Sequence, residues 1–216
     1  MKAIIIGASG ATGKELVNHL ITDEKYTEII CLVRRKLEIQ NSKIKEVVID
    51  FDKLNDYKDY FLADVAFSCL GTTIKDAGSK DIQWKIDYEY QLKFAQIAKE
   101  KNIETFVLIS SVGANKNSKI FYTKMKGALE IEIEKLNFQK TIIMQPPSLI
   151  RPNSNRKGEL IGMKTIFFLN KIGLFKSYKP LHVSDLAKVM LISVEQLPVG
   201  AFRLKPTEIQ KMIPTS

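Results

Sequence analysis

A strand, a turn and a helix are predicted to meet at Gly7-Ala8-Ser9-Gly10-Ala11-Thr12-Gly13, the stretch that decides the fold of this chain. An apolar run precedes the stretch, and a segment with apolar residues three and four positions apart follows it. The first glycine allows a tight turn, the second lets backbone approach a pyrophosphate, and the third lets helix and strand pack closely. The helix N-terminus attracts phosphate, and the hydroxyls of Ser9 and Thr12 can add contacts. We therefore predict a dinucleotide-binding loop.

The rest of the chain alternates short apolar runs with amphipathic segments. The runs are Ala3–Ile6, Ile29–Val33, Glu46–Ile49, Val65–Leu70, Phe106–Ile109 and Thr141–Met144. Continuously apolar runs indicate strands that are buried on both faces, and intervening helices indicate right-handed crossovers. The pattern predicts an α/β fold with a doubly wound parallel sheet of the Rossmann type and helices on both faces.

The regular alternation weakens after Pro146-Pro147. We interpret residues 1–216 as a single NAD(P)-binding domain in which residues 151–216 form a reduced, substrate-side cap. Within that cap we expect a loop over 151–158, helices over 159–169 and 184–194, and a last strand over 200–204. Ser184 and Asp185 are expected to cap the second helix. Residues 161–175 could form the core or a pocket lid, a dimer face, or a membrane-surface helix.

The composition is that of an ordinary globular protein with a basic surface. The 216 residues include 33 Lys and Arg against 24 Asp and Glu, which gives a net charge of +9. Such a surface suits nucleotides, nucleic acid or an acidic membrane face, or has no binding role. No regular basic stripe with interleaved aromatic residues is present, so we expect no nucleic-acid partner. No apolar stretch of about 18 residues is present, so we expect no membrane span.

Cysteine and histidine usage suggests a compartment and argues against a metal site. Cys31 and Cys69 each lie in an apolar run, as buried thiols do in a reducing compartment. The N-terminal apolar run is too short for a secretory signal, so a cytoplasmic location is expected. His19 and His182 lie far apart without metal-ligand spacing, so no metal is expected.

Three cations follow the second predicted strand and bear on the choice of cofactor. Arg34 lies 21 residues after Gly13, where NAD-binding folds usually carry an acid for the ribose 2′-hydroxyl. Arg34-Arg35-Lys36 carries no acid and can clamp a 2′-phosphate, so NADP(H) is favoured over NAD(H). The alternative is an exposed basic turn. Asp50, after the third strand, is expected beside the adenine or as a solvated loop acid.

A serine, a tyrosine and a lysine suggest carbonyl chemistry. Ser110 and Ser111 end the fifth predicted strand, and Tyr122 and Lys126 follow four residues apart. That spacing places the tyrosine and the lysine on one face of a helix. A free tyrosine hydroxyl has a pKa of about 10, so it needs a nearby cation to act near neutral pH. We expect Tyr122 to be the acid/base group, Lys126 to supply the charge and hold the nicotinamide ribose, and Ser111 to polarise the carbonyl, although Ser110 stays open for that role.

Together these motifs resemble the short-chain dehydrogenase/reductases. More specifically, the chain resembles their atypical branch of the Tat-interacting-protein type over about residues 1–195. The stretches that carry this resemblance are Asp64–Thr73, Ser110–Ala114 and Tyr122–Gly127. Pro146-Pro147 departs from the Arg-Pro-Gly that is more usual in that branch.

The resemblance implies an NADPH-binding fold with Tyr122 as the proton donor and acceptor and Lys126 as its partner. It also places Leu149 beside the nicotinamide and suggests an arginine in the following loop, which is Arg151 or Arg156. The cofactor contacts that it implies are Ser9, Gly10, Ala11, Thr12, Arg34, Arg35, Leu70 and Gly71.

The favoured interpretation is an NADP(H)-dependent oxidoreductase that acts on a small carbonyl compound or alcohol. A second interpretation is a redox-sensing module that binds NADP(H) and a regulatory protein partner without turnover. A third, less favoured, is a sugar-nucleotide epimerase or dehydratase, because the reduced C-terminal segment leaves little room for a nucleotide-sugar. A homodimer stays open.

Overall fold

The computed structural model describes residues 1–37, 39–151 and 179–214. Within these ranges the main sheet has seven parallel strands in the order β3-β2-β1-β4-β5-β6-β9, which confirms the predicted doubly wound sheet. Its strands are β1 (Lys2–Ile6), β2 (Glu28–Val33), β3 (Ile44–Val48), β4 (Val65–Ser68), β5 (Thr105–Ile109), β6 (Lys140–Met144) and β9 (Gly200–Leu204). A separate two-stranded sheet pairs β7 (Leu149–Ile150) with β8 (Leu181–His182).

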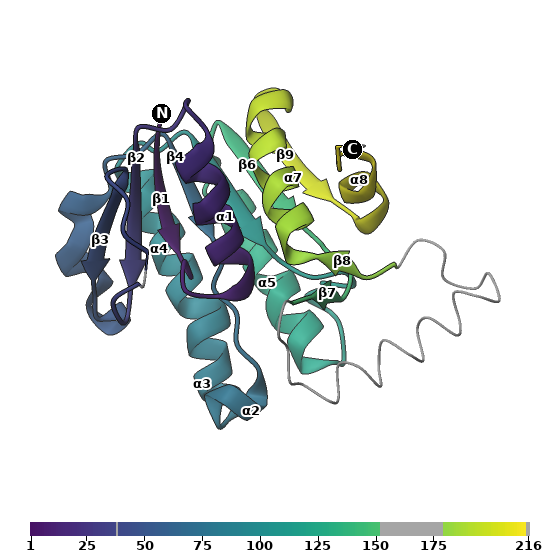
Figure 1. Cartoon of the computed structure of the whole chain (residues 1–216). Coiled ribbons are helices and arrows are strands. Elements are labelled where there is room, and N and C mark those ends of the chain that lie inside the picture. Colours follow the sequence, from purple (N-terminus) through teal and green to yellow (C-terminus); the bar gives the residue numbers. More distant parts are fainter. Residues whose placement is uncertain (38, 152–178, 215–216) are drawn as a thin grey trace.

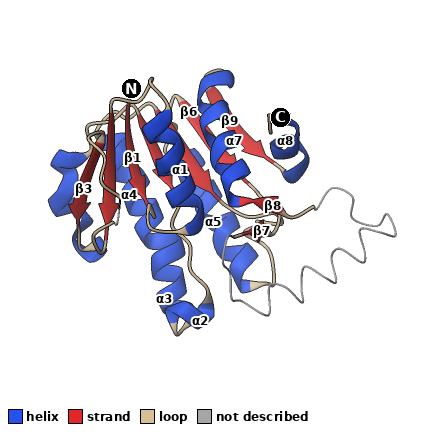
Figure 2. Cartoon of the chain, viewed as in Figure 1, coloured by secondary structure: helices blue, strands red, loops and turns tan. Residues whose placement is uncertain are grey.

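Helices cover both faces of the main sheet (Figures 1 and 2). In those views α1 and α7 lie together on one face, and α4 and α5 lie on the other. The helical elements are α1 (Ala11–Thr22), η1 (Phe51–Tyr60), α2 (Ile74–Ala77), α3 (Lys80–Trp84), η2 (Lys85–Glu89), α4 (Tyr90–Glu100), α5 (Phe121–Lys135), α7 (Val183–Gln196) and α8 (Pro206–Lys211).

The strand β1 shows why the apolar runs are continuous. Ala3 and Ile5 belong to the core cluster beneath α1 and α7, whereas Ile4 and Ile6 belong to the cluster on the other face. All four are fully buried. Because successive side chains of a strand point to opposite faces, a sheet covered by helices on both sides requires apolar residues at every position.

The sheet order reverses beside β1. Ile6 at the end of β1 pairs with Leu32 of β2 on one side and with Ser68 of β4 on the other. The chain leaves β1 for β2 and β3 and then crosses over to β4. In open α/β sheets ligands bind in the crevice at this switch point, outside the carboxyl ends of the strands. The glycine-rich turn and the segment after β4 both lie there.

The C-terminal part of the chain completes the sheet. β9 pairs in parallel with β6 and confirms the predicted last strand. The predicted capping of the next helix by Ser184 and Asp185 is wrong, because α7 begins at Val183 and His182 occupies the N-cap position. The Ser184 hydroxyl instead lies 3.3 Å from Nε2 of His19 on α1.

The predicted helix over 159–169 and the segment 161–175 both fall within residues 152–178, outside the described residues. The assignment of residues 151–216 as a substrate-side cap therefore stays a prediction. No helix within the described ranges is long and apolar enough to span a bilayer.

Candidate functional site

The turn after β1 is built so tightly that Gly7 and Gly13 leave no room for a side chain. Gly7 has a φ of +81°, and a Cβ there would lie 2.5 Å from the carbonyl carbon of Cys69. A Cβ on Gly13 would lie 2.1 Å from the Gly7 carbonyl oxygen. The Gly10 N–H donates to that same oxygen at 2.9 Å. The first and third glycines therefore serve the turn and the helix–strand contact, as predicted.

The N-terminus of α1 can hold an anionic group. Gly10 is the N-cap residue and makes no side-chain cap, and the first turn of α1 contains no acidic residue. The first N–H groups of a helix have no partner within the helix, and they lie at the positive end of its dipole. A helix start whose first turn has free N–H groups and no acidic side chain fits the pyrophosphate of a dinucleotide.

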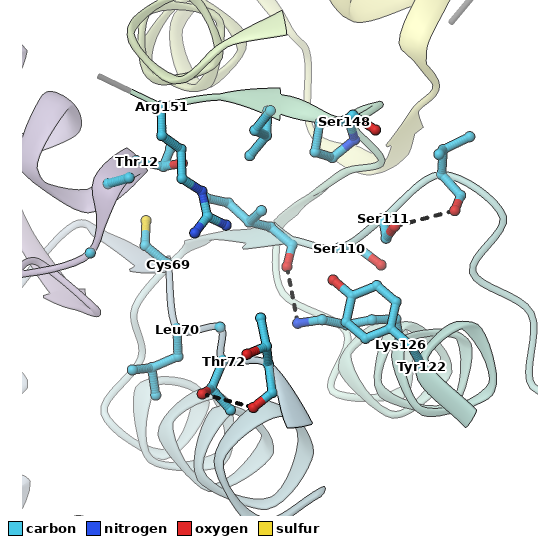
Figure 3. Close-up of a pocket in the computed structure, with 18 of the residues that line it drawn as sticks. Thr12, Cys69, Leu70, Thr72, Ser110, Ser111, Tyr122, Lys126, Ser148 and Arg151 are labelled. Carbon is cyan, nitrogen blue, oxygen red and sulfur yellow. Dashed lines mark hydrogen bonds between the residues drawn. The ribbon is translucent and has the colours of Figure 1, made fainter. Parts of the chain in front are cut away.

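A cavity of about 590 Å³ opens at the carboxyl ends of the strands (Figure 3). It combines the first turn of α1, the segments after β4, β5 and β6, and the start of α5. Its walls are Gly10, Ala11, Thr12, Cys69, Leu70, Gly71, Thr72, Thr73, Ile109, Ser110, Ser111, Val112, Tyr122, Lys126, Pro146, Pro147, Ser148, Leu149 and Arg151. The structure thus brings together residues from five separate parts of the chain.

Tyr122 and Lys126 lie one turn apart on α5 and both line this cavity. Tyr122 is 38% exposed, whereas Lys126 is 2% exposed. The Lys126 ammonium donates to the Ile109 carbonyl at 3.5 Å. In Figure 3 the tyrosine hydroxyl lies on the same side of the cavity as the hydroxyls of Ser110 and Ser111. The Tyr122 phenol is thus accessible to a ligand, and the Lys126 ammonium is buried one helical turn away.

The two adjacent serines have different surroundings. The Ser110 hydroxyl donates to the buried carboxylate of Glu130, which also accepts from the Gln145 amide at 2.9 and 3.0 Å. Burial raises the pKa of Glu130, while these donors and Arg203 oppose the shift. The Ser111 hydroxyl donates to the neighbouring Val112 carbonyl at 3.2 Å. Ser111 can exchange that weak local contact for a ligand, whereas Ser110 is part of a buried network.

A close contact holds the serine loop against α5. A Cβ on Gly127, the residue after Lys126, would lie 2.4 Å from the backbone of Asn115. The Asn115 N–H donates to the Thr123 carbonyl at 2.9 Å. This contact ties the loop that follows Ser111 to the helix that carries Tyr122.

The residues expected near the adenosine half lie outside this cavity. Arg34 and Arg35 follow β2 with exposed side chains, and within the described residues neither forms an ion pair. Asp50 is exposed and accepts from the Asp52 N–H at 3.0 Å, so it caps η1. Ser9 is exposed on the glycine turn. Their contacts to a cofactor stay predictions.

Leu149 and Arg151 line the cavity from the segment after β6. In Figure 3 the guanidinium of Arg151, the residue after β7, extends into the cavity on the side where Thr12 and Cys69 lie. Arg156, the alternative arginine, lies outside the described residues.

Sequence reasoning missed a layer of buried polar side chains beneath the cavity, formed by Ser68, Gln83, Asp87, Gln91, Glu130 and Gln145. One signal was available for Glu130, which lies four residues after Lys126 and eight after Tyr122 and so shares their helix face. The others come from segments far apart in the chain, and no spacing rule connects them.

The two thiols are held in their neutral form. Burial raises the pKa of Cys31 to about 12 and raises that of Cys69 as well. Neither is therefore a thiolate near neutral pH. The described residues contain no group of three or more His, Cys, Asp or Glu side chains placed to hold a metal.

Comparison with known proteins identifies relatives of the whole nucleotide-binding region. A family model described as NAD(P)H-binding matches residues 7–154. The HTATIP2 protein of Rattus norvegicus is 35% identical over 165 residues, which cover 74% of this chain and 68% of the relative. The mitochondrial FMP52 protein of Eremothecium gossypii is 31% identical over 175 residues, which cover 80% of this chain and 76% of the relative.

The expected cytoplasmic location is contradicted by these relatives. FMP52 proteins from four fungi are named as mitochondrial, which points away from a purely cytoplasmic location. The prediction relied on the two buried thiols and on an N-terminal apolar run too short for a secretory signal. Neither observation distinguishes one reducing compartment from another.

Two solved structures of proteins with bound UDP-glucose share this fold. UDP-glucose 4-epimerase of Thermotoga maritima superposes with a TM-score of 0.72 at 14% identity, covering 95% of this chain and 77% of the epimerase. MoeE5 in complex with UDP-glucose and NAD superposes with a TM-score of 0.70 at 14% identity, covering 95% of this chain and 76% of MoeE5. At such identity they show the fold alone. The glycine turn, the cavity beside it and the sequence relatives all indicate a dinucleotide-binding protein. The chain belongs to the NAD(P)H-binding Rossmann family, in the atypical short-chain dehydrogenase/reductase group with HTATIP2 and FMP52.

Proposed function

We propose that this protein is an NADP(H)-dependent oxidoreductase that interconverts a small carbonyl compound and its alcohol, with Tyr122 as the acid/base group. One observation carries the proposal. Tyr122, Lys126 and Ser111 line the same cavity as Gly10 and Thr12 of the glycine turn. An acid/base group, a cation and a hydroxyl donor therefore face the space that a dinucleotide held at α1 would enter.

The walls of the cavity suggest how the cofactor is held. The N–H groups at the start of α1 would hold the pyrophosphate, and Leu70 and Leu149 would line the nicotinamide half. Arg34 and Arg35, which follow β2, would hold the 2′-phosphate, because a guanidinium forms paired hydrogen bonds with phosphate oxygens. Arg151 holds an anionic group inside the cavity. The reduced nicotinamide would supply the hydride that reaches the carbonyl carbon.

The side chains of the protein complete the reduction. Tyr122 donates its phenolic proton to the carbonyl oxygen, so that hydride and proton together convert the carbonyl to an alcohol. The buried ammonium of Lys126 stabilises the phenolate that this leaves. Ser111 donates a hydrogen bond to the same carbonyl oxygen and supports the charge that develops there. In the oxidation direction each transfer runs in reverse.

The first test separates binding from turnover. NADPH affinity is measured by calorimetry, and aldehydes, ketones and quinones are then screened with the wild type and Tyr122→Phe. We expect the variant to bind NADPH within about threefold of wild type and to lose at least about 100-fold in turnover, the usual contribution of a positioned acid/base group. Tyr60→Phe, on η1 and away from the cavity, serves as the control and keeps full activity.

Two results would contradict the enzymatic proposal. Tight NADPH binding with no turnover across the whole screen would favour a redox-sensing regulatory module. Turnover that survives Tyr122→Phe would exclude this tyrosine as the acid/base group. The fold neighbours do not favour an epimerase, because their 14% identity carries no residue of the site across to this chain.

A further inference from the structure

Large hydrophobic side chains are exposed beside the cavity. Eight such side chains are exposed within the described residues, and four of them lie in α2, in α3 or at the start of α5. Ile74 is 46% exposed, Ile82 is 48% exposed and Ile120 is 66% exposed. The fourth is Tyr122 of the cavity wall. Single exposed apolar residues are ordinary, whereas several gathered in one place indicate an interaction site.

Side-chain contacts hold these three elements together. The helix α2 packs against α3. The rings of Trp84 in α3 and Phe121 in α5 have their centroids 6.3 Å apart, and the Lys80 ammonium lies 5.7 Å from the centroid of the Phe121 ring. Figure 1 shows α2 and α3 at the lower end of the molecule. The exposed isoleucines therefore lie on adjacent elements, next to the cavity walls Thr73 and Tyr122.

The same segments carry an excess of positive charge. Residues 74–84 and 114–124 contain five lysines and two aspartates. All five lysines are exposed, and within the described residues none of them forms an ion pair. The Asp76 carboxylate accepts the Thr73 hydroxyl at 2.9 Å. The cations around the exposed isoleucines are Lys75, Lys80, Lys116, Lys119 and Lys124.

We propose that the surface formed by Ile74, Ile82, Ile120 and these five lysines binds the face of a lipid bilayer that contains anionic lipids. The isoleucines enter the boundary between headgroups and acyl chains, and the lysines bind the phosphates of the headgroups. Trp84 and Tyr122 lie at the level where aromatic rings with a polar group are favoured.

The charge favours lipid over a protein partner. Lysine is depleted in protein–protein interfaces, because its strongly hydrated ammonium is costly to bury. A lysine at a bilayer surface stays hydrated, since its long stem lies along apolar groups while its ammonium remains among the headgroups. Apolar side chains ringed by lysines therefore fit an anionic bilayer. The inference does not depend on the proposed catalytic activity.

Trp84 provides a direct measurement, because the chain contains a single tryptophan. The protein is sedimented with vesicles of phosphatidylcholine alone and with vesicles of equal parts phosphatidylcholine and phosphatidylglycerol. We expect binding to the mixed vesicles to be at least about tenfold tighter and to weaken with added salt. Bromine on the acyl chains should quench the fluorescence of Trp84. Absence of binding overturns the proposal, and so does binding without quenching, which would assign the contact to another face.

Paired variants test the apolar contacts. Ile82→Gln combined with Ile120→Ser should weaken binding to the mixed vesicles by about tenfold or more. Ile120 is the N-cap residue of α5, where serine is preferred, so this variant should fold. The control combines Leu62→Gln with Val199→Ser, two exposed apolar residues that precede β4 and β9 at the opposite end of the sheet. It should bind as wild type does, and equal losses in both pairs overturn the proposal.

A second pair tests the charges. Lys116→Gln combined with Lys119→Gln should weaken binding by about tenfold, whereas Lys188→Gln combined with Lys211→Gln, on α7 and α8, should not. Sedimentation velocity covers the alternative occupant: a dimer that the isoleucine pair dissociates, without vesicle binding, would assign this surface to a second copy of the chain and overturn the proposal. No readout involves NADPH or a substrate, so failure here and failure of the proposed function are told apart.

Discussion

The Ser110 hydroxyl donates a hydrogen bond to the buried carboxylate of Glu130, and this bond assigns different roles to two serines that are neighbours in the chain. Glu130 also accepts from Gln145 and lies 3.6 Å from the Arg203 guanidinium of β9. Ser110 therefore connects the end of β5 with α5, β6 and β9. Ser111 lines the cavity, and its hydroxyl donates only to the adjacent Val112 carbonyl rather than to the buried network.

The two serines should respond differently to alanine substitution. Ser110→Ala removes one hydrogen-bond donor from the buried Glu130 carboxylate, which keeps the Gln145 amide, and should lower the free energy of unfolding by about 1–3 kcal/mol. Ser111→Ala should leave stability within about 0.5 kcal/mol and lower turnover by about 100-fold, as expected for loss of one donor to a developing oxyanion. Urea unfolding and steady-state kinetics check the pair, each variant serving as the control for the other. The reverse pattern would assign the catalytic role to Ser110.

Glu130 should make stability depend on pH. Its pKa is raised in the folded protein, so its contribution is fully present below the unfolded pKa of about 4.3 and is lost as the pH rises through the folded value. Glu130→Gln, which cannot ionise, should therefore gain stability relative to wild type as the pH rises from about 4 toward neutrality. Urea unfolding of both proteins across that range provides the measurement. A constant difference between them would show that the carboxylate does not titrate in this way.

The glycine turn should not tolerate a methyl group at the start of α1. A Cβ on Gly13 would lie 2.1 Å from the Gly7 oxygen, so Gly13→Ala should cost about 1–3 kcal/mol and impair NADPH binding. Gly71→Ala is the control for stability, because no atom lies within 4 Å of a Cβ at that position. Thermal unfolding and calorimetry measure the two effects. Wild-type stability in Gly13→Ala would contradict the close contact.

The basic turn after β2 should set the choice between the two cofactors. Arg34→Ala should weaken NADPH by roughly 10- to 100-fold, since a charge-assisted bond contributes about 1.5–3 kcal/mol, and should leave NADH almost unchanged. Lys2→Ala removes a cation at the amino end of β1, the end of the strands opposite to the glycine turn. It should change the affinities for NADPH and NADH equally. Calorimetric titration of both variants with both cofactors is the measurement. Equal losses of affinity for NADPH and for NADH in Arg34→Ala would contradict a contact between Arg34 and the 2′-phosphate.

Local pattern was sufficient for the sheet and for the glycine turn. The strand β1 is apolar from Ala3 to Ile6 because it is covered on both faces, and that leaves a continuous apolar run in the sequence. The capping of α7 could not be predicted equally well. Ser184 is a good capping residue by type, but it contacts His19 on α1, and that packing is invisible along the chain.

The sequence by itself determined the alternation of strands and helices, the glycine turn and the spacing of Tyr122 and Lys126, because each depends on residues that are close together in the chain. The tertiary structure alone decided that the Ser110 hydroxyl donates to Glu130 and that the Asp87 carboxylate accepts the Thr72 N–H. These two hydrogen bonds join residues that lie 20 and 15 positions apart in the chain. Burial gives such polar side chains their partners and their charge state, and burial depends on the packing of the whole fold.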